Sequence, residues 1–223
     1  MKSVTAQISS LTILSGVVAF ISYLLVAMSV NYNFEVFNDP TLLLTLPEVN
    51  VSMLRWSMIT DVLGYYLLLV PAMFFLQDWM QAKTAWSKPL TFCGIAYVLI
   101  GSVGASILAV VWPLLIAQYP TASLPQQATI TLLFDTTSEL VYGGLWNLLA
   151  MLVGGIWWTG VGLQLWHTQK ALAITTLVVG GCVLADTLGG MLQLAVLAEV
   201  GLNIYLVLAP LWVIWLGLAL RKI

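Results

Sequence analysis

Long apolar runs separated by short polar segments dominate the pattern of this chain. The runs are continuous, without the alternation of a membrane-spanning strand, so they predict helices. Each is long enough to cross a hydrocarbon core, which takes about 20 residues. We therefore predict an all-α fold, a polytopic transmembrane bundle with six spans in one domain over residues 1–223. The spans are expected at about 8–30, 54–78, 89–117, 131–166, 171–193 and 203–221.

Composition supports a membrane protein and excludes a soluble one. The chain is 61% hydrophobic and 7% charged, with a mean hydropathy of +1.01, whereas a soluble domain carries about 25% charged residues. The lipid bilayer is therefore the first expected partner. The net charge is −2 and no basic patch occurs, so we expect no nucleic-acid partner.

Positive charges predict the orientation. If both termini share one side, that side collects Lys2, Lys83, Lys88, Lys170, Arg221 and Lys222. The opposite segments contain Arg55 as their one basic residue and carry Glu35, Asp39, Glu48 and Glu199. The positive-inside rule then places both termini in the cytoplasm of a multi-pass protein of the plasma or inner membrane.

Smaller signals concern connections, cysteines and packing. The segment TLLLTL, residues 41–46, is expected to form a short interfacial helix. Cys93 and Cys182 differ in predicted depth and should remain free thiols. Glycine pairs in the third to fifth spans should allow close helix packing, and could also support a homo-oligomer or a partner subunit.

The intramembrane acids carry the functional signal. Asp61 and Asp186 each lie about two turns inside the outer end of a span. Asp135 and Glu139 lie in the outer part of the fourth span, and Arg55 opens the second. An ionisable residue inside a span is costly, and it usually faces the bundle interior, a partner or water.

Helical spacing sorts the polar residues into stripes. One stripe contains Asp135, Glu139, Tyr142 and Trp146, because these positions share a helix face. Two others are Ser57–Asp61–Tyr65 and Asp186–Gly190–Gln193. Turned toward one another, the stripes would form an outward-facing pocket, whose expected ligand-binding residues are Asp61, Asp135, Glu139, Asp186, Arg55, Tyr65, Tyr142 and Trp146.

The sequence lacks the residue patterns that a metal site or a cofactor site requires. The single histidine, His167, has no neighbouring ligand set, so we predict no metal site. No motif for a phosphate or a covalently held group is present, and we expect no cofactor. The question of enzyme activity stays open, with a non-enzyme favoured, because carboxyl groups are the one candidate acid–base chemistry.

Three functions are compatible with these residues. The first is binding or transport of a small cation, a proton or a cationic solute. The second is an intramembrane enzyme acting on a lipid-soluble substrate, with Arg55 holding an anionic group. The third is a non-catalytic subunit or sensor, in which Arg55 and the acids form a structural clasp.

Residues 155–190, from GIWWTG to DTLGG, also carry a resemblance. Their Gly-Ile-Trp-Trp start, the later Gly162, the short basic loop and a glycine pair in the next span are similar to a bacterial family of six-helix integral membrane proteins of unknown function. The resemblance implies the six-helix fold and assigns no activity.

Overall fold

The computed structural model of the protein describes residues 2–37 and 39–221, which form helices without a strand. Six helical spans are long and apolar enough to cross a membrane, which confirms the predicted architecture. The elements are α1 (Lys2–Ser29), η1 (Phe34–Phe37), α2 (Leu42–Thr45), α3 (Val51–Asp61), η2 (Val62–Tyr66), η3 (Leu67–Leu69), α4 (Val70–Gln81), α5 (Ser87–Gln118), η4 (Tyr119–Thr121), α6 (Leu124–Glu139), η5 (Leu140–Ala150), α7 (Met151–Leu165), α8 (Lys170–Met191) and α9 (Ala195–Ala219).

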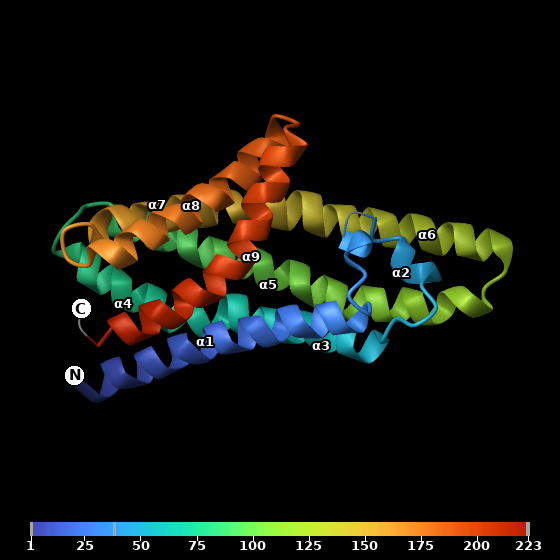
Figure 1. Ribbon diagram of the computed structural model, residues 1–223, viewed down its shortest axis with the longest axis horizontal. Coiled ribbons are helices and arrows are strands. Elements are labelled where there is room, and N and C mark those ends of the chain that lie inside the picture. Colours follow the sequence, from blue (N-terminus) through green and yellow to red (C-terminus); the bar gives the residue numbers. More distant parts are fainter. Residues whose placement is uncertain (1, 38, 222–223) are drawn as a thin grey trace.

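The spans form a ring in which each one packs against its neighbours in sequence. α1 contacts α3 and also α9, so the last span closes the ring against the first. α5 packs between α3 and α7, and α8 packs between α7 and α9. Figure 1 shows both ends of the chain at the same end of the bundle, as an even number of spans requires.

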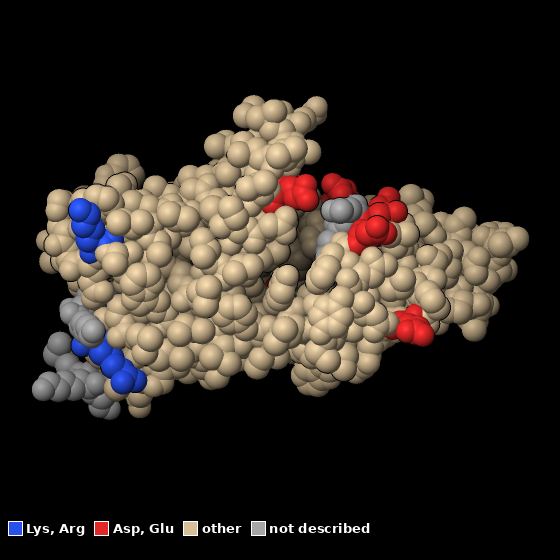
Figure 2. All heavy atoms as spheres, viewed as in Figure 1, with Lys and Arg blue, Asp and Glu red and all other residues tan. Residues whose placement is uncertain are grey.

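Basic residues lie at the end that holds the termini. We name this the basic end, defined by Lys83, Lys88, Lys170 and Arg221, and the opposite end the distal end (Figure 2). The predicted basic residue Lys222 and the side chain of Lys2 lie outside the described part. The Lys83 ammonium lies 3.4 Å from the Trp79 ring centroid, and that of Lys170 lies 5.5 Å from the Trp166 ring. Such pairs suit a membrane surface.

The cytoplasmic position of the basic end stays a prediction with a direct test. A reporter fused after Ile223 is expected to read as cytoplasmic, because the loop lysines gather on that side. The measurement is paired alkaline phosphatase and fluorescent-protein fusions, with matched fusions inside the connection between α5 and α6. A periplasmic C-terminal reporter would place the distal end in the cytoplasm and contradict the predicted orientation.

Two helices extend beyond the rest at the distal end. The spans Ser87–Thr121 and Leu124–Leu165 have 35 and 42 residues, well above the roughly 20 that a hydrocarbon core requires. They form a two-helix arm joined at η4 (Figure 1).

The hairpin of α8 and α9 diverges from the bundle at its tip (Figure 1). α8 ends at Met191, and Gln193 adopts a positive φ of 57° in the turn. Gln193 is therefore no member of a helical stripe with Asp186, contrary to the prediction. α9 begins at Ala195, earlier than the predicted start at 203.

Most glycines serve packing within the chain, as predicted. A Cβ at Gly155 would lie 2.6 Å from the Leu184 side chain, and one at Gly180 would lie 2.9 Å from the Thr159 backbone nitrogen. Three glycines face open space: Gly144, Gly181 and Gly190. Association with another chain through glycine-rich faces stays a prediction. Cys93 and Cys182 are free, which confirms that expectation.

Candidate functional site

A cavity of about 360 Å³ lies inside the ring, in its distal half. Its walls come from α3 with η2, from α6 with η5, and from α9, and Pro40 of the first connection closes one edge. The volume falls within the range of small-molecule sites, which is roughly 300–1,000 Å³. The lining residues are Pro40, Asp61, Tyr65, Tyr66, Asp135, Ser138, Glu139, Tyr142, Gly143, Trp146, Asn147, Met151, Leu202, Tyr205 and Leu206.

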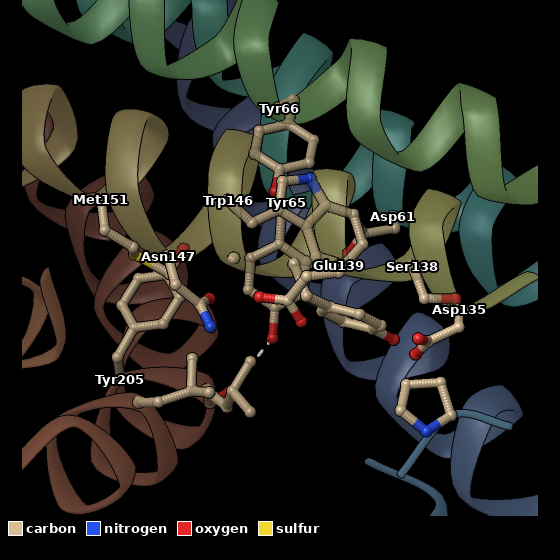
Figure 3. A pocket seen from close by; sticks show the side chains of 15 residues that line it. Asp61, Tyr65, Tyr66, Asp135, Ser138, Glu139, Trp146, Asn147, Met151 and Tyr205 are labelled. Carbon is tan, nitrogen blue, oxygen red and sulfur yellow. Dashed lines mark hydrogen bonds between the residues drawn. The ribbon is translucent and has the colours of Figure 1, made fainter. Parts of the chain in front are cut away.

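The structure brings two of the predicted stripes to this cavity. Asp61 and Tyr65 line it from the second span. The whole fourth-span stripe lines it from the other side, namely Asp135, Glu139, Tyr142 and Trp146. In the view of Figure 3 the Glu139 carboxylate is turned into the cavity, between Asn147 and Asp135. Their role in binding a ligand stays a prediction.

Both of these walls contain a π-helical segment that begins directly after an acid. η2 follows Asp61, and the longer η5 follows Glu139. Such wide turns are rare inside helices and are frequent at functional sites. In the second span Pro71 contributes to the irregularity, because proline has no N–H to donate to the carbonyl one turn earlier.

The wide turn in η2 places two consecutive tyrosines on one cavity. Neighbours on a regular helix point about 100° apart, yet Tyr65 and Tyr66 both line the space. The Tyr65 hydroxyl donates to the Leu206 carbonyl at 3.1 Å, so it joins η2 to α9 across the cavity (Figure 3). A Cβ at Gly101 would collide with the Tyr66 ring, so only glycine leaves room for that ring.

Asp61 is half-buried in the cavity wall beside α1. The Ser22 side chain of α1 lies beside its carboxyl group. The Ser22 hydroxyl donates to the Ser57 carbonyl at 2.9 Å, one turn earlier on α3. These contacts fix the position of Asp61 relative to the first span.

Aromatic side chains close the cavity toward the basic end. The Tyr205 hydroxyl lies 2.7 Å from that of Tyr97, and the Tyr66 and Tyr97 ring centroids are 5.2 Å apart. Trp158 contacts both Tyr97 and Tyr205, with centroid distances of 5.1 and 5.7 Å. We name Tyr66, Tyr97, Tyr205 and Trp158 the aromatic floor. Below it, the basic half of the ring is a packed apolar core.

Trp146 is fixed on the opposite wall. Its indole N–H donates to the Gly101 carbonyl at 3.1 Å, and its ring lies edge-on to Tyr142 with centroids 5.1 Å apart. Trp112 of α5 is buried. Its N–H donates to the Ser138 hydroxyl at 2.9 Å, and its ring stacks on Phe134.

Asp186 does not line the cavity, so the prediction that it shares a pocket with Asp61 is wrong. Its neighbour Thr187 faces η5 and donates to the Asn147 carbonyl at 3.0 Å. Asp186 is turned away from that contact by about 100°, and α9 packs closely at this level, through Gly201. The side chain is 2% exposed, and its Oδ2 has no hydrogen-bond partner among the described residues.

Arg55 also lies outside the cavity, contrary to the prediction. It is exposed on the first turns of α3. At about 100° per residue, its direction differs from that of Asp61 by about 120°. Within the described residues no ion pair joins Arg55 to Asp61, Asp135 or Glu139, so the predicted clasp is not formed.

The chemistry of the lining is acidic and aromatic. Three carboxyl groups, of Asp61, Asp135 and Glu139, contribute to it, and none of the lining residues is Lys, Arg or His. The described residues contain no group of three or more metal-ligating side chains. The arrangement can accept hydrogen bonds and offer ring faces to a positive charge.

Sequence reasoning missed lining residues on several elements, including three on α9. Tyr205 gave one usable signal, because it is a polar-tipped residue in an otherwise apolar span. Tyr66 lies off the Ser57–Asp61–Tyr65 stripe of a regular helix, so helical spacing did not mark it. Leu202, Leu206 and Met151 gave no signal, because any apolar residue of a span looks the same in the sequence.

Comparisons of the chain with protein-family models, with curated proteins and with solved structures found no match.

Proposed function

We propose that the protein binds a small organic cation, an amine or a quaternary ammonium compound, in this cavity. The carrying observation is that three carboxyl groups and several aromatic rings line one cavity whose lining residues include no basic side chain. Asp61 and Glu139 would balance the positive charge. Tyr65, Tyr142 and Trp146 would present ring faces to the cationic group, as in the aromatic sites that recognise quaternary ammonium ligands.

Size and geometry favour an organic cation over a metal ion or a proton. The cavity volume suits a molecule of several heavy atoms. A bound metal ion requires several ligands converging within bonding distance, and the described carboxyl groups do not converge in that way. The organic part of a bound ligand would cover the carboxyl groups in place of water.

Binding, rather than transport or catalysis, is the function that the geometry supports best. Below the aromatic floor the interior is filled by apolar side chains, so transport would need a second conformation. Catalysis on an anionic lipid would need Arg55 at the cavity, and it faces elsewhere. We place the protein in the plasma or inner membrane, with the cavity on the non-cytoplasmic side, from the positive-inside rule.

The test compares a cation with a neutral molecule of the same shape. Choline and 3,3-dimethylbutan-1-ol are titrated into the purified protein by isothermal titration calorimetry in dodecyl maltoside. We expect choline to bind and the neutral alcohol to bind at least tenfold more weakly, because only the former interacts with the carboxylates. Replacement of the exposed Asp78, outside the cavity, by Asn is the control and should leave choline binding unchanged. Equal affinities, or no binding of choline, would refute the proposal.

A further inference from the structure

The cavity opens through the side of the bundle rather than only at its distal end. Figure 2, viewed across the long axis of the helices, shows a hollow in the face of the molecule beside acidic side chains. The part of α9 that descends from the diverging tip runs along the edge of this hollow (Figures 1 and 2). Access to the cavity is therefore lateral, from the medium that surrounds the ring.

The side opening follows from where α1 and α9 touch. Their close contacts lie toward the basic end: Gly16 packs on Pro210 and Ile214, and the Ser9 hydroxyl donates to the Gly217 carbonyl at 2.7 Å. The distal half of α9, which carries Leu202 and Leu206, instead forms a wall of the cavity.

One part of the cavity lies at the depth of the hydrocarbon core. At about 1.5 Å per residue, Leu206 and Leu202 lie about 20 and 26 Å from Ala219, where α9 ends at the basic end. Helix tilt only reduces their depth, and a hydrocarbon core is about 30 Å thick. The tip beside them exposes apolar residues, namely Leu188, Met191, Leu192, Leu194, Val196, Leu197 and Val200. A tip with this surface is stable in lipid.

The acids lie at a different level from the leucines. By the same rise Asp61 is about 30 Å from Gln81, and Glu139 is about 39 Å from Leu165. These levels correspond to the edge of the hydrocarbon and the headgroup region. One cavity thus combines a carboxylate site at the membrane surface with an apolar wall inside it.

We infer that the ligand is a single-chain amphiphile with a cationic head, which enters from the distal leaflet through the side opening. This inference rests on the proposed function, and it adds the tail. The ammonium head occupies the space among Asp61, Glu139 and the aromatic rings. The alkyl chain passes Met151, Leu202 and Leu206 and continues into the lipid, so the head need not leave the membrane surface to bind.

The test varies the alkyl chain of the ligand and the apolar wall of the cavity separately. Tetramethylammonium, octyltrimethylammonium and octanol are titrated into wild-type protein and Leu206→Asn at a fixed dodecyl maltoside concentration. We expect octyltrimethylammonium to bind wild type at least tenfold more tightly than tetramethylammonium. Leu206→Asn should weaken octyltrimethylammonium about tenfold, as expected when two or three methylene groups lose an apolar wall. Tetramethylammonium should change less than twofold.

Matched variants distinguish the outcomes. Val207→Asn, a lipid-facing position of the same helix, should leave both affinities unchanged, and Leu206→Ala replaces Leu206→Asn if the latter does not fold. Equal binding of the two cations, or no effect at Leu206, overturns the tail inference and leaves the cation site standing. Octanol binding as well as octyltrimethylammonium, or no binding of either cation, overturns the proposed function and this inference together.

Discussion

Replacing Gly64 by alanine is expected to cause the largest loss of stability among substitutions that add a single heavy atom in the bundle. Gly64 lies in η2, where it faces the backbone of α1: a Cβ would collide with the Ala19 backbone nitrogen. Its carbonyl also accepts a hydrogen bond from the buried Ser15 hydroxyl of α1. Because the colliding atoms belong to backbone, they cannot move by a rotamer change, and α1 must shift as a whole.

The expected cost is about 1–3 kcal/mol in the free energy of unfolding, as for other overpacked sites. Alanine favours a helix by about 1 kcal/mol over glycine, which offsets only part of it. The measurement is thermal or denaturant unfolding in a fixed detergent. Gly181→Ala in α8 is the matched control, because open space surrounds that position. A Gly64→Ala protein as stable as Gly181→Ala would contradict the close approach of α1 and η2.

Asp61→Asn is expected to weaken choline binding by tenfold to about a hundredfold. The change keeps the shape of the side chain and removes one negative charge from a partly buried cavity. At an effective dielectric constant near 20, two unit charges about 5 Å apart interact by roughly 3 kcal/mol, and solvent in the open cavity reduces this. The amide occupies the same space beside Ser22, so the melting temperature should change little. Calorimetry and unfolding on the same preparation measure both quantities.

The control is Asp186, the buried aspartate of α8. Asp186 is buried outside the cavity, and its Oδ2 has no hydrogen-bond partner in the described part of the chain. Asp186→Asn should therefore leave choline affinity within twofold of wild type. An equal loss in the two variants would show that a general effect on the bundle, rather than the cavity, controls binding. Unchanged affinity in Asp61→Asn would remove Asp61 from the site.

The six-span architecture follows from the sequence because hydrocarbon imposes a simple requirement on each segment separately. A span must be long, apolar and internally hydrogen-bonded, so six runs predict six helices without knowledge of their contacts. The fourth-span stripe was also readable, because Asp135, Glu139, Tyr142 and Trp146 share a face through local helical geometry alone. The π-helical η5 still leaves them all on the cavity.

How those faces meet depends on packing between the spans. The direction of a side chain in the ring depends on the rotation of its helix, which is set by packing and leaves no trace in hydropathy. Asp61 and Asp186 had similar patterns and similar predicted depths, yet α9 packs closely at Asp186 while Asp61 borders the cavity. Likewise Tyr66 joins Tyr65 on the cavity through the wide turn of η2, and Leu202 and Leu206 line it through the position of α9 in the ring, which hydropathy does not show. Local spacing therefore identified six of the fifteen lining residues, and the packing of the ring supplied the others.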